Sequence, residues 1–243
     1  MKQNEPDLGR IRAGLVLGLL GDPGALTYKR SRQGDTLTDV TAGYALSQID
    51  PESRVVPFSP YGYDERQLCS PGFNLPVGRL TRSVNDGYPQ YHTSADDLTL
   101  IQPGCLEQSL AACKLFVTVL EEDARYVNRS PKGEPRLGKR GLYGPVGGTS
   151  PAEREQAMLW LLNQSDGSKS LLDVARRSGL PFGVLREAAT ALEQSGLLRE
   201  TGDATRVRRR RSSLELCSPG HKSRGNRPDG TDGRLVRRKG GKR

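Results

Sequence analysis

Histidine, cysteine, tryptophan and long apolar runs are all scarce in this sequence. Its 243 residues include two His, four Cys and one Trp, and aromatic side chains make up 5% of the total. The cysteines form no CxxC pair, which argues against a cysteine zinc site and indicates reduced thiols at irregular spacings: Cys69, Cys105, Cys113 and Cys217. The longest apolar run, residues 15–20, is far too short to cross a bilayer. Residues 1–12 lack the apolar core of a secretory signal, so we expect a cytoplasmic protein without membrane contact.

Positive charge is concentrated at the C-terminal end. The chain has a formal net charge of +9, but residues 203–243 alone hold 14 Lys and Arg against 4 Asp and Glu. The rest of the chain is therefore close to neutral. We expect residues 201–243 to form a disordered basic tail, which can bind nucleic acid without sequence preference.

The first half of the chain predicts an α/β domain. Short apolar segments at 13–20, 54–58 and 77–82 read as strands, and residues 36–49 and 103–126 read as helices. Such alternation places the functional site at the carboxyl edge of a sheet. Three strands are fewer than the usual mean of roughly five to six, so residues 1–127 are expected to form only part of a domain.

The second half predicts a small helical domain after a linker. Residues 128–149 are rich in Pro, Gly, Lys and Arg, as in a linker. Residues 150–200 then show three helix patterns: one after the capping box at 150–153, one from Ser170 to Gly179, and one from Pro181 to Gly196. With an apolar strand behind them, these helices predict a winged helix-turn-helix domain. Residues 150–200 hold 6 Lys and Arg against 7 Asp and Glu, which favours protein contact or dimerisation over DNA recognition.

One loop carries a candidate ligand. His92 lies in the turn-prone segment 88–97 and is followed by the carboxylates Asp96 and Asp97. A neutral imidazole is a common metal ligand, and a nearby carboxylate can fix its tautomer. A solvent-exposed histidine in a polar loop is the alternative interpretation of the same residues.

Two further segments complete a family resemblance. Gly-Asp-Pro-Gly-Ala-Leu-Thr-Tyr-Lys-Arg-Ser-Arg (21–32) follows the first strand, and Ser-Pro-Tyr-Gly-Tyr-Asp-Glu-Arg-Gln (59–67) forms a later loop. With the histidine loop and the winged helix, residues 13–199 resemble a bacterial family of aminopeptidase-like proteins. Members are often labelled polysaccharide-biosynthesis proteins with an aminopeptidase-like domain, and their core is similar to co-catalytic di-zinc exopeptidases.

The resemblance implies roles for particular residues. Asp22 matches a carboxylate that binds one zinc ion, and His92 matches the histidine that binds the other. Asp97 is expected to orient the histidine loop. The resemblance implies more weakly that Asp64, Glu65 and Arg66 shape the pocket for the substrate terminus. The implied substrate is a peptide or small amide, cleaved at its N-terminal bond by metal-activated water.

Several site residues of the family have no match in this sequence. The first histidine, the bridging aspartate and the Glu-Glu pair of the family lie upstream of the strand that precedes Asp22, and no residue here matches them. The second histidine, His221, lies in the basic tail. One Asp and one His cannot complete a two-zinc site, because each zinc ion takes about four ligands.

Three interpretations remain open. The chain is a C-terminal half that is inactive alone, without catalytic residues of its own. Alternatively, a partner chain or a second copy supplies the missing half of an enzyme. The third interpretation is a non-enzymatic binding module that uses the winged helix for protein or DNA contact and the tail for nucleic acid.

Overall fold

The computed structural model describes residues 7–84, 87–142 and 151–202. Residues 203–243 of the predicted tail, which include Cys217 and His221, lie outside these ranges, as do Ser150 and residues 143–149 of the predicted linker. No helix within the described ranges combines the length and apolar character that membrane crossing requires.

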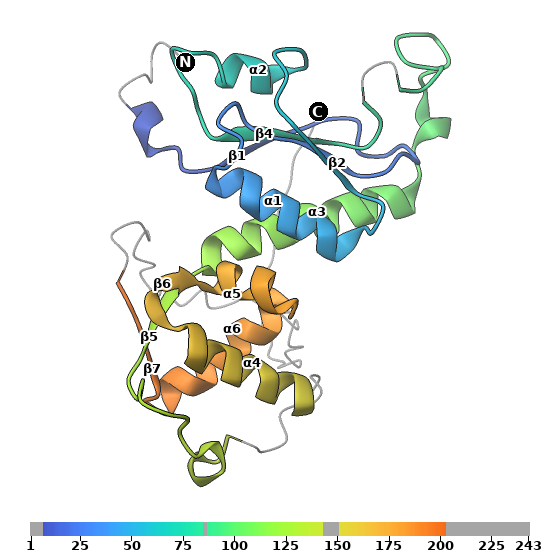
Figure 1. Cartoon of the computed structure of the whole chain (residues 1–243). Helices are drawn as coiled ribbons and strands as arrows, with labels where there is room; N and C mark the ends of the chain where they lie inside the picture. The colour runs from blue at the N-terminus through green and yellow to red at the C-terminus, as the bar shows by residue number, and fades with distance from the viewer. Residues whose placement is uncertain (1–6, 85–86, 143–150, 203–243) are drawn as a thin grey trace, which may run out of the picture. The chain divides into compact units, whose positions relative to one another are not determined.

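The N-terminal part is an α/β unit built on a sheet of four short strands, seen at the top of Figure 1. The sheet order is β1 (Gly14–Leu17), β4 (Val77–Thr81), β2 (Thr27–Lys29) and β3 (Arg54–Val56). The pairs β1–β4 and β2–β3 are parallel, whereas β2 and β4 are antiparallel. The predicted strands are present, and β2 is a fourth strand that the sequence did not predict. β2 is only three residues long and contains no apolar run. Its extended conformation depends on hydrogen bonding to β4 on one side and β3 on the other.

Helices cover both faces of this sheet (Figure 1). On one face lie α1 (Leu37–Ile49) and α3 (Pro103–Glu122), which contact each other; on the other lies the short α2 (Asp64–Leu68). A capping box begins α1, with Thr36 and Asp39 bonding each other's backbone amides. Pro103 lies in the first turn of α3, where a missing amide proton costs nothing. A 3-10 helix, η2 (Leu98–Leu100), precedes α3.

The core of the α/β unit lies between the sheet and the pair α1 and α3. Side chains alternate across a strand, so Tyr28 and Leu80, which are opposite each other in the β2–β4 pair, both point to this side. They pack with apolar residues of the two helices: Ala42, Ala45, Leu46, Ala112 and Phe116. The other face of β2 and β4 carries charged residues.

The C-terminal part is a winged helix. Its elements are β5 (Arg125–Asn128), the 3-10 helix η3 (Leu137–Arg140), α4 (Pro151–Gln164), β6 (Asp166–Ser170), α5 (Leu171–Ser178), α6 (Phe182–Gln194) and β7 (Leu198–Glu200). The sheet order is β6-β5-β7, with both pairs antiparallel. The predicted α/β class with a C-terminal winged helix is therefore confirmed.

The start of the winged helix differs from the prediction. We expected it at residue 150, with the α/β domain extending to 127 and a linker from 128. In the structure α3 ends at Glu122, and β5 forms the central strand of the winged-helix sheet. Sequence periodicity could not show this, because β5 pairs with strands about 40 and 70 residues further along the chain.

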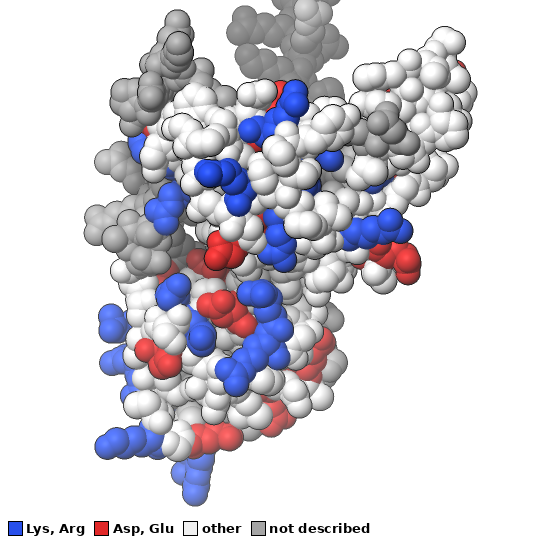
Figure 2. All heavy atoms as spheres, turned by 45° about the horizontal axis from the view of Figure 1, so that its top comes forward, with Lys and Arg blue, Asp and Glu red and all other residues white. Residues whose placement is uncertain are grey.

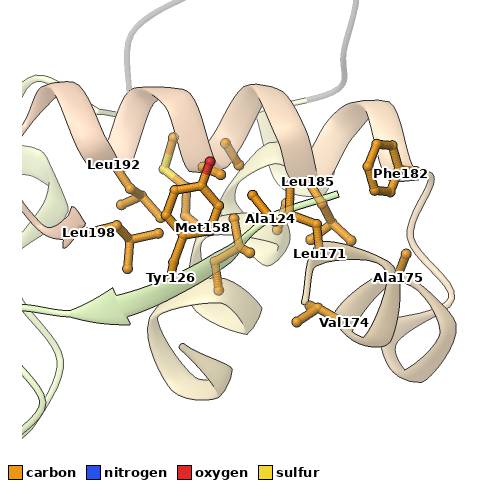
Figure 3. Packing of buried hydrophobic residues seen from close by; sticks show 14 of the residues in the cluster. Ala124, Tyr126, Met158, Leu171, Val174, Ala175, Phe182, Leu185, Leu192 and Leu198 are labelled. Carbon is orange, nitrogen blue, oxygen red and sulfur yellow. The ribbon is translucent and has the colours of Figure 1, made fainter. Parts of the chain in front are cut away.

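The winged helix has its own apolar core (Figure 3). Tyr126 of β5 and Leu198 of β7 pack against the helices, and Met158, Leu185 and Leu192 are at most 1% exposed. An alternating or helical apolar pattern supplies each of these positions, and Tyr44 of α1 and Val119 of α3 belong to the same buried cluster.

Candidate functional site

Asp22 lies just beyond β1 and is almost completely buried, with 7% exposure. Its Oδ1 accepts hydrogen bonds from the amide of Gly24 at 2.9 Å and the hydroxyl of Ser83 at 2.5 Å. The amide of Ser83 lies 3.2 Å from Oδ1 and 3.3 Å from Oδ2. Asp22 therefore joins the segment after β1 to the segment after β4 and leaves Oδ2 as its less engaged oxygen.

Glycine is needed at position 24 for this arrangement. A Cβ there would lie 2.6 Å from the Ser83 hydroxyl and 2.8 Å from Asp22 Oδ1. Both distances are below van der Waals contact, so a side chain would push the carboxylate out of place. The Gly-Asp-Pro-Gly segment singled out from sequence thus positions Asp22 by close backbone approach.

His92 lies on an exposed loop and not in a closed pocket. Its backbone has a positive φ of 58°, and its ring stacks on that of Tyr91 with centroids 4.0 Å apart. The bonds that the structure gives to Asp97 come from Thr99, through its amide at 2.8 Å and its hydroxyl at 2.6 Å. Hydrogen bonding by the Thr99 side chain and backbone lowers the pKa of Asp97. Asp97 therefore caps η2, and its expected role in orienting the histidine loop stays a prediction.

Tyrosines connect the histidine loop to the rest of the site. Tyr91 contacts Tyr88 edge to face, and its hydroxyl lies 3.4 Å from that of Tyr63. Burial raises the pKa of Tyr88, and the hydrogen bond to Asp96 and the negative charges of Asp96 and Asp22 raise it further. The loop and Asp22 thus lie within electrostatic reach of each other.

The three residues predicted to shape a substrate pocket separate in the structure. Asp64 and Arg66 are exposed on α2, whereas Glu65 is fully buried. Glu65 Oε1 lies 2.7 Å from Lys29 Nζ and 3.7 Å from the Arg79 guanidinium, and Oε2 accepts the amide proton of Tyr63 at 3.0 Å. We refer to Lys29, Glu65 and Arg79 as the Glu65 cluster.

Strand register explains the Glu65 cluster. Lys29 of β2 lies directly opposite Arg79 of β4, and like charges in such a pair repel. Glu65 lies on α2, and its negative charge between the two cations offsets their repulsion. The ring of Tyr63 covers the Arg79 guanidinium at 4.9 Å, and Phe58 lies 5.5 Å from Lys29 Nζ.

Backbone carbonyls complete the environment of Lys29. Its ammonium donates to the carbonyls of Ser59 at 3.0 Å and Tyr61 at 2.6 Å, which fixes the 59–67 loop over the sheet. Gly62, at φ 151°, has no room for a side chain, because a Cβ would lie 2.0 Å from Glu65 Oε1. Tyr63 then joins the cluster to the histidine loop, and burial together with its contact to Tyr91 raises its pKa.

Arg82 is a further site residue that sequence reasoning missed. It is 4% exposed and donates to the Gly24 carbonyl at 2.7 Å, to the Ser109 hydroxyl at 3.0 Å and to the Cys105 carbonyl at 2.9 Å. It holds the segment after Asp22 against α3. An arginine at the end of a predicted strand was the only available signal, and its partners are far away in sequence.

These residues do not complete a metal centre by themselves. In the ranges that the structure describes, no group of three His, Cys, Asp or Glu side chains is placed to hold a metal ion. Asp22 Oδ2 has the chemistry of one zinc ligand and the His92 imidazole that of another, but each zinc ion needs about four donors.

Comparison with known proteins defines the class of the chain. Residues 1–123 match the family described as a domain of unknown function, DUF4910, and residues 124–200 match a winged helix-turn-helix family. The chain belongs to the DUF4910 family and carries a C-terminal winged helix.

Two similar proteins come from Clostridium acetobutylicum. One, provisionally named a polysaccharide biosynthesis protein with an aminopeptidase-like domain, is 42% identical over 82% of this chain and 46% of its own length. The other is a crystal structure, provisionally described as a peptidase, with a TM-score of 0.74 and 41% identity. It aligns with 82% of this chain and 44% of its own. The aminopeptidase-like relationship is thus confirmed, and the chain spans less than half the length of these relatives.

Proposed function

We propose that the chain is the C-terminal part of a two-part aminopeptidase-like site and is inactive without the complementary part. The completed site would hydrolyse the N-terminal bond of a peptide or a related small amide. Asp22 and His92 would each supply one zinc ligand, and the complementary part would supply the remaining ligands and the general base. The observation that carries the proposal is the buried, oriented Asp22 carboxylate, whose Oδ2 accepts a single long hydrogen bond, from the Ser83 amide, and is the less engaged of its two oxygens.

The distribution of exposed apolar residues supports this proposal. All the large hydrophobic residues exposed in the described ranges belong to the α/β part: Ile11, Leu17, Leu37, Val55, Tyr61, Val84, Leu98, Ile101, Leu106, Leu110 and Val117. Exposed apolar residues that gather on one element, as they do on α3, are typical of an interaction site. In the described residues of the winged helix, by contrast, no large hydrophobic residue is exposed.

Helix α3 presents the clearest unpartnered face. Leu106, Leu110 and Val117 share one side of the helix and are 45–53% exposed. The edge strands β1 and β3 also expose Leu17 and Val55. Additional strands and a helix from a complementary part would cover these surfaces.

The test combines the chain with the portion of the Clostridium acetobutylicum relative that it does not match. We expect co-elution in size-exclusion chromatography and hydrolysis of aminoacyl 4-nitroanilides in the presence of zinc only by the combined parts. Leu110→Glu should abolish co-elution, because it places a charge in the apolar interface. Glu107→Gln, also exposed on α3, is the matched control. Turnover by the chain alone, or failure of the two parts to associate, would overturn the proposal.

A protein-contact role for the winged helix is the second candidate function. The hydroxyl of Tyr44 in α1 accepts the amide proton of Phe182 at 2.8 Å, and Arg186 forms an ion pair with Glu122 of α3. These bonds engage the first turns of α6, the helix that would enter a DNA groove in other winged helices. They favour contact with protein over reading of duplex DNA by α6.

A further inference from the structure

The extended winged helix is more basic than its helices alone. Residues 124–200 hold 12 Lys and Arg against 8 Asp and Glu, whereas residues 150–200 hold 6 against 7. Of the six added cations, Arg125 lies in β5 and the other five lie in the segment between β5 and α4. The near-neutral charge that disfavours nucleic-acid binding is a property of residues 150–200 and not of the whole domain.

Four of the added cations line one hollow. Lys132, Arg136, Lys139 and Arg140 are exposed and surround a depression of about 610 Å³, in which Glu134 is the only carboxylate of the lining. Figure 2 shows Lys and Arg at the lower edge of the molecule in that view, with Asp and Glu beside them. Concentration in one concave surface distinguishes this set from a solvated charge run.

The folded domain holds these cations in place. Leu137 of η3 is 1% exposed and belongs to the winged-helix core, so it anchors the turn that carries Lys139 and Arg140. The Arg140 guanidinium donates to the Ser195 carbonyl at the C-terminal end of α6, at 3.2 Å. At the other end of the segment, the Arg129 amide donates to the Leu197 carbonyl at 2.8 Å.

A second hollow adjoins the first. It has a volume of about 580 Å³, is lined by Trp160, Leu159 and Gln156, and shares Gly133 and Glu134 with the basic hollow. Trp160 is half-buried and packs against the domain core, which fixes its indole.

Asn128 is the last residue of β5 and lines the second hollow. Its side-chain amide donates to the Leu162 carbonyl at 2.7 Å, and its Oδ1 accepts the amide proton of Ser130 at 2.8 Å. These two bonds tie the start of the basic segment to α4, the helix that carries Trp160. The aromatic and basic hollows are therefore held side by side.

We propose that these two hollows bind single-stranded nucleic acid, with phosphates in the basic hollow and an unstacked base on Trp160. A cationic groove beside an aromatic platform is the arrangement that recognises single strands, because every base offers a π-face and every nucleotide a phosphate. Glu134, which lines both hollows, would accept a hydrogen bond from a base amino group. The base must leave its stack to reach the indole, so duplex DNA is excluded. This surface is independent of the site around Asp22.

Trp160 provides a direct test, because it is the only tryptophan in the sequence. We expect a twelve-nucleotide single-stranded oligonucleotide to quench its fluorescence in the full chain, with an affinity that falls as salt rises. Replacing Lys132 and Arg136 with Gln should lower the salt slope by about 1.4, as expected for two lost phosphate contacts on a single strand. Trp160→Leu should weaken binding of a labelled oligonucleotide about tenfold, as expected for one lost stacking platform.

Matched controls separate this surface from the basic tail. Lys169→Gln with Arg176→Gln removes two exposed cations of the same domain outside both hollows and should leave the quenching unchanged. Neutralising Arg208 to Arg211 should lower overall affinity while the quenching persists. Oligonucleotide binding without a change in Trp160 emission would overturn the proposal. Equal quenching by duplex DNA, or by a mononucleotide at the same concentration, would also overturn it.

Discussion

At the residue scale, the site depends on charges that are buried and paired. Glu65 is fully buried between Lys29 and Arg79, and these two cations are opposite each other on neighbouring strands. Removing one partner of a buried ion pair lowers the free energy of unfolding by far more than the intact pair contributes to it. The reason is that the remaining charge stays buried without a counter-charge. Glu65 is therefore a structural support for the loop that carries Tyr61 and Tyr63.

Glu65→Gln is expected to lower the free energy of unfolding by about 3–5 kcal/mol, because both cations stay buried without a carboxylate. Urea unfolding followed by circular dichroism measures this change. Asp64→Asn, at the exposed neighbouring position, should stay within about 0.5 kcal/mol of the unmodified chain. Equal stability of the two variants would show that the Glu65 cluster does not support the fold.

At the element scale, the N-terminus of α1 is held by a network around Asp39. This carboxylate accepts hydrogen bonds from the Ser31 amide at 2.7 Å, the Thr36 hydroxyl at 2.7 Å and the Tyr28 hydroxyl at 2.8 Å. Burial acts to raise the pKa of Asp39, but the hydrogen bonds from Ser31, Thr36 and Tyr28 outweigh it and lower the pKa. The network joins α1 to β2, the strand that the sequence did not predict.

This network predicts a pH dependence of stability. Because the folded-state pKa of Asp39 is depressed, its contribution is fully present above the unfolded-state pKa of about 3.9. The contribution is lost as pH falls through the lower folded-state pKa. We expect Asp39→Asn to be less stable at pH 7 by about 2 kcal/mol and to show a shallower loss of stability on acidification. Urea unfolding between pH 2 and 7 tests this, with exposed Asp35→Asn as control; identical acid slopes for both variants would contradict it.

At the scale of the whole molecule, the α/β part and the winged helix differ in how completely they bury their hydrophobic residues. The large hydrophobic residues that are exposed in the described ranges belong to the α/β part, whereas those of the winged helix are buried or partly buried. Tyr44 of α1 nevertheless joins the winged-helix core and accepts the Phe182 amide proton. This bond joins the two parts at the beginning of α6.

Tyr44→Phe should destabilise the chain by about 1–3 kcal/mol, because it leaves the buried Phe182 amide without its acceptor. Hydrogen exchange should accelerate at the first turn of α6 while the core of α4 stays protected. Tyr61→Phe, at a position with 64% exposure, should change neither measurement. Unchanged exchange at Phe182 in the Tyr44 variant would show that the bond does not couple the two parts.

The sequence by itself determined the elements whose signals are local. The apolar stripe of α3, the helices of the winged helix and the strands β1, β3 and β4 follow from periodicity over adjacent residues. The motifs at 21–32, 59–67 and 88–97 were enough to indicate the family and to single out Asp22 and His92. These signals need no knowledge of what the residues contact.

Only the tertiary structure decided the features that depend on distant partners. β2 is too short to have a pattern of its own, and its pairing with β4 places Lys29 opposite Arg79 and requires Glu65. β5 belongs to the winged helix because it pairs with β6 and β7, which brings the basic segment beside Trp160. Strand register and charge pairing arise between segments far apart in the chain, where hydrophobic periodicity along the sequence carries no information about them.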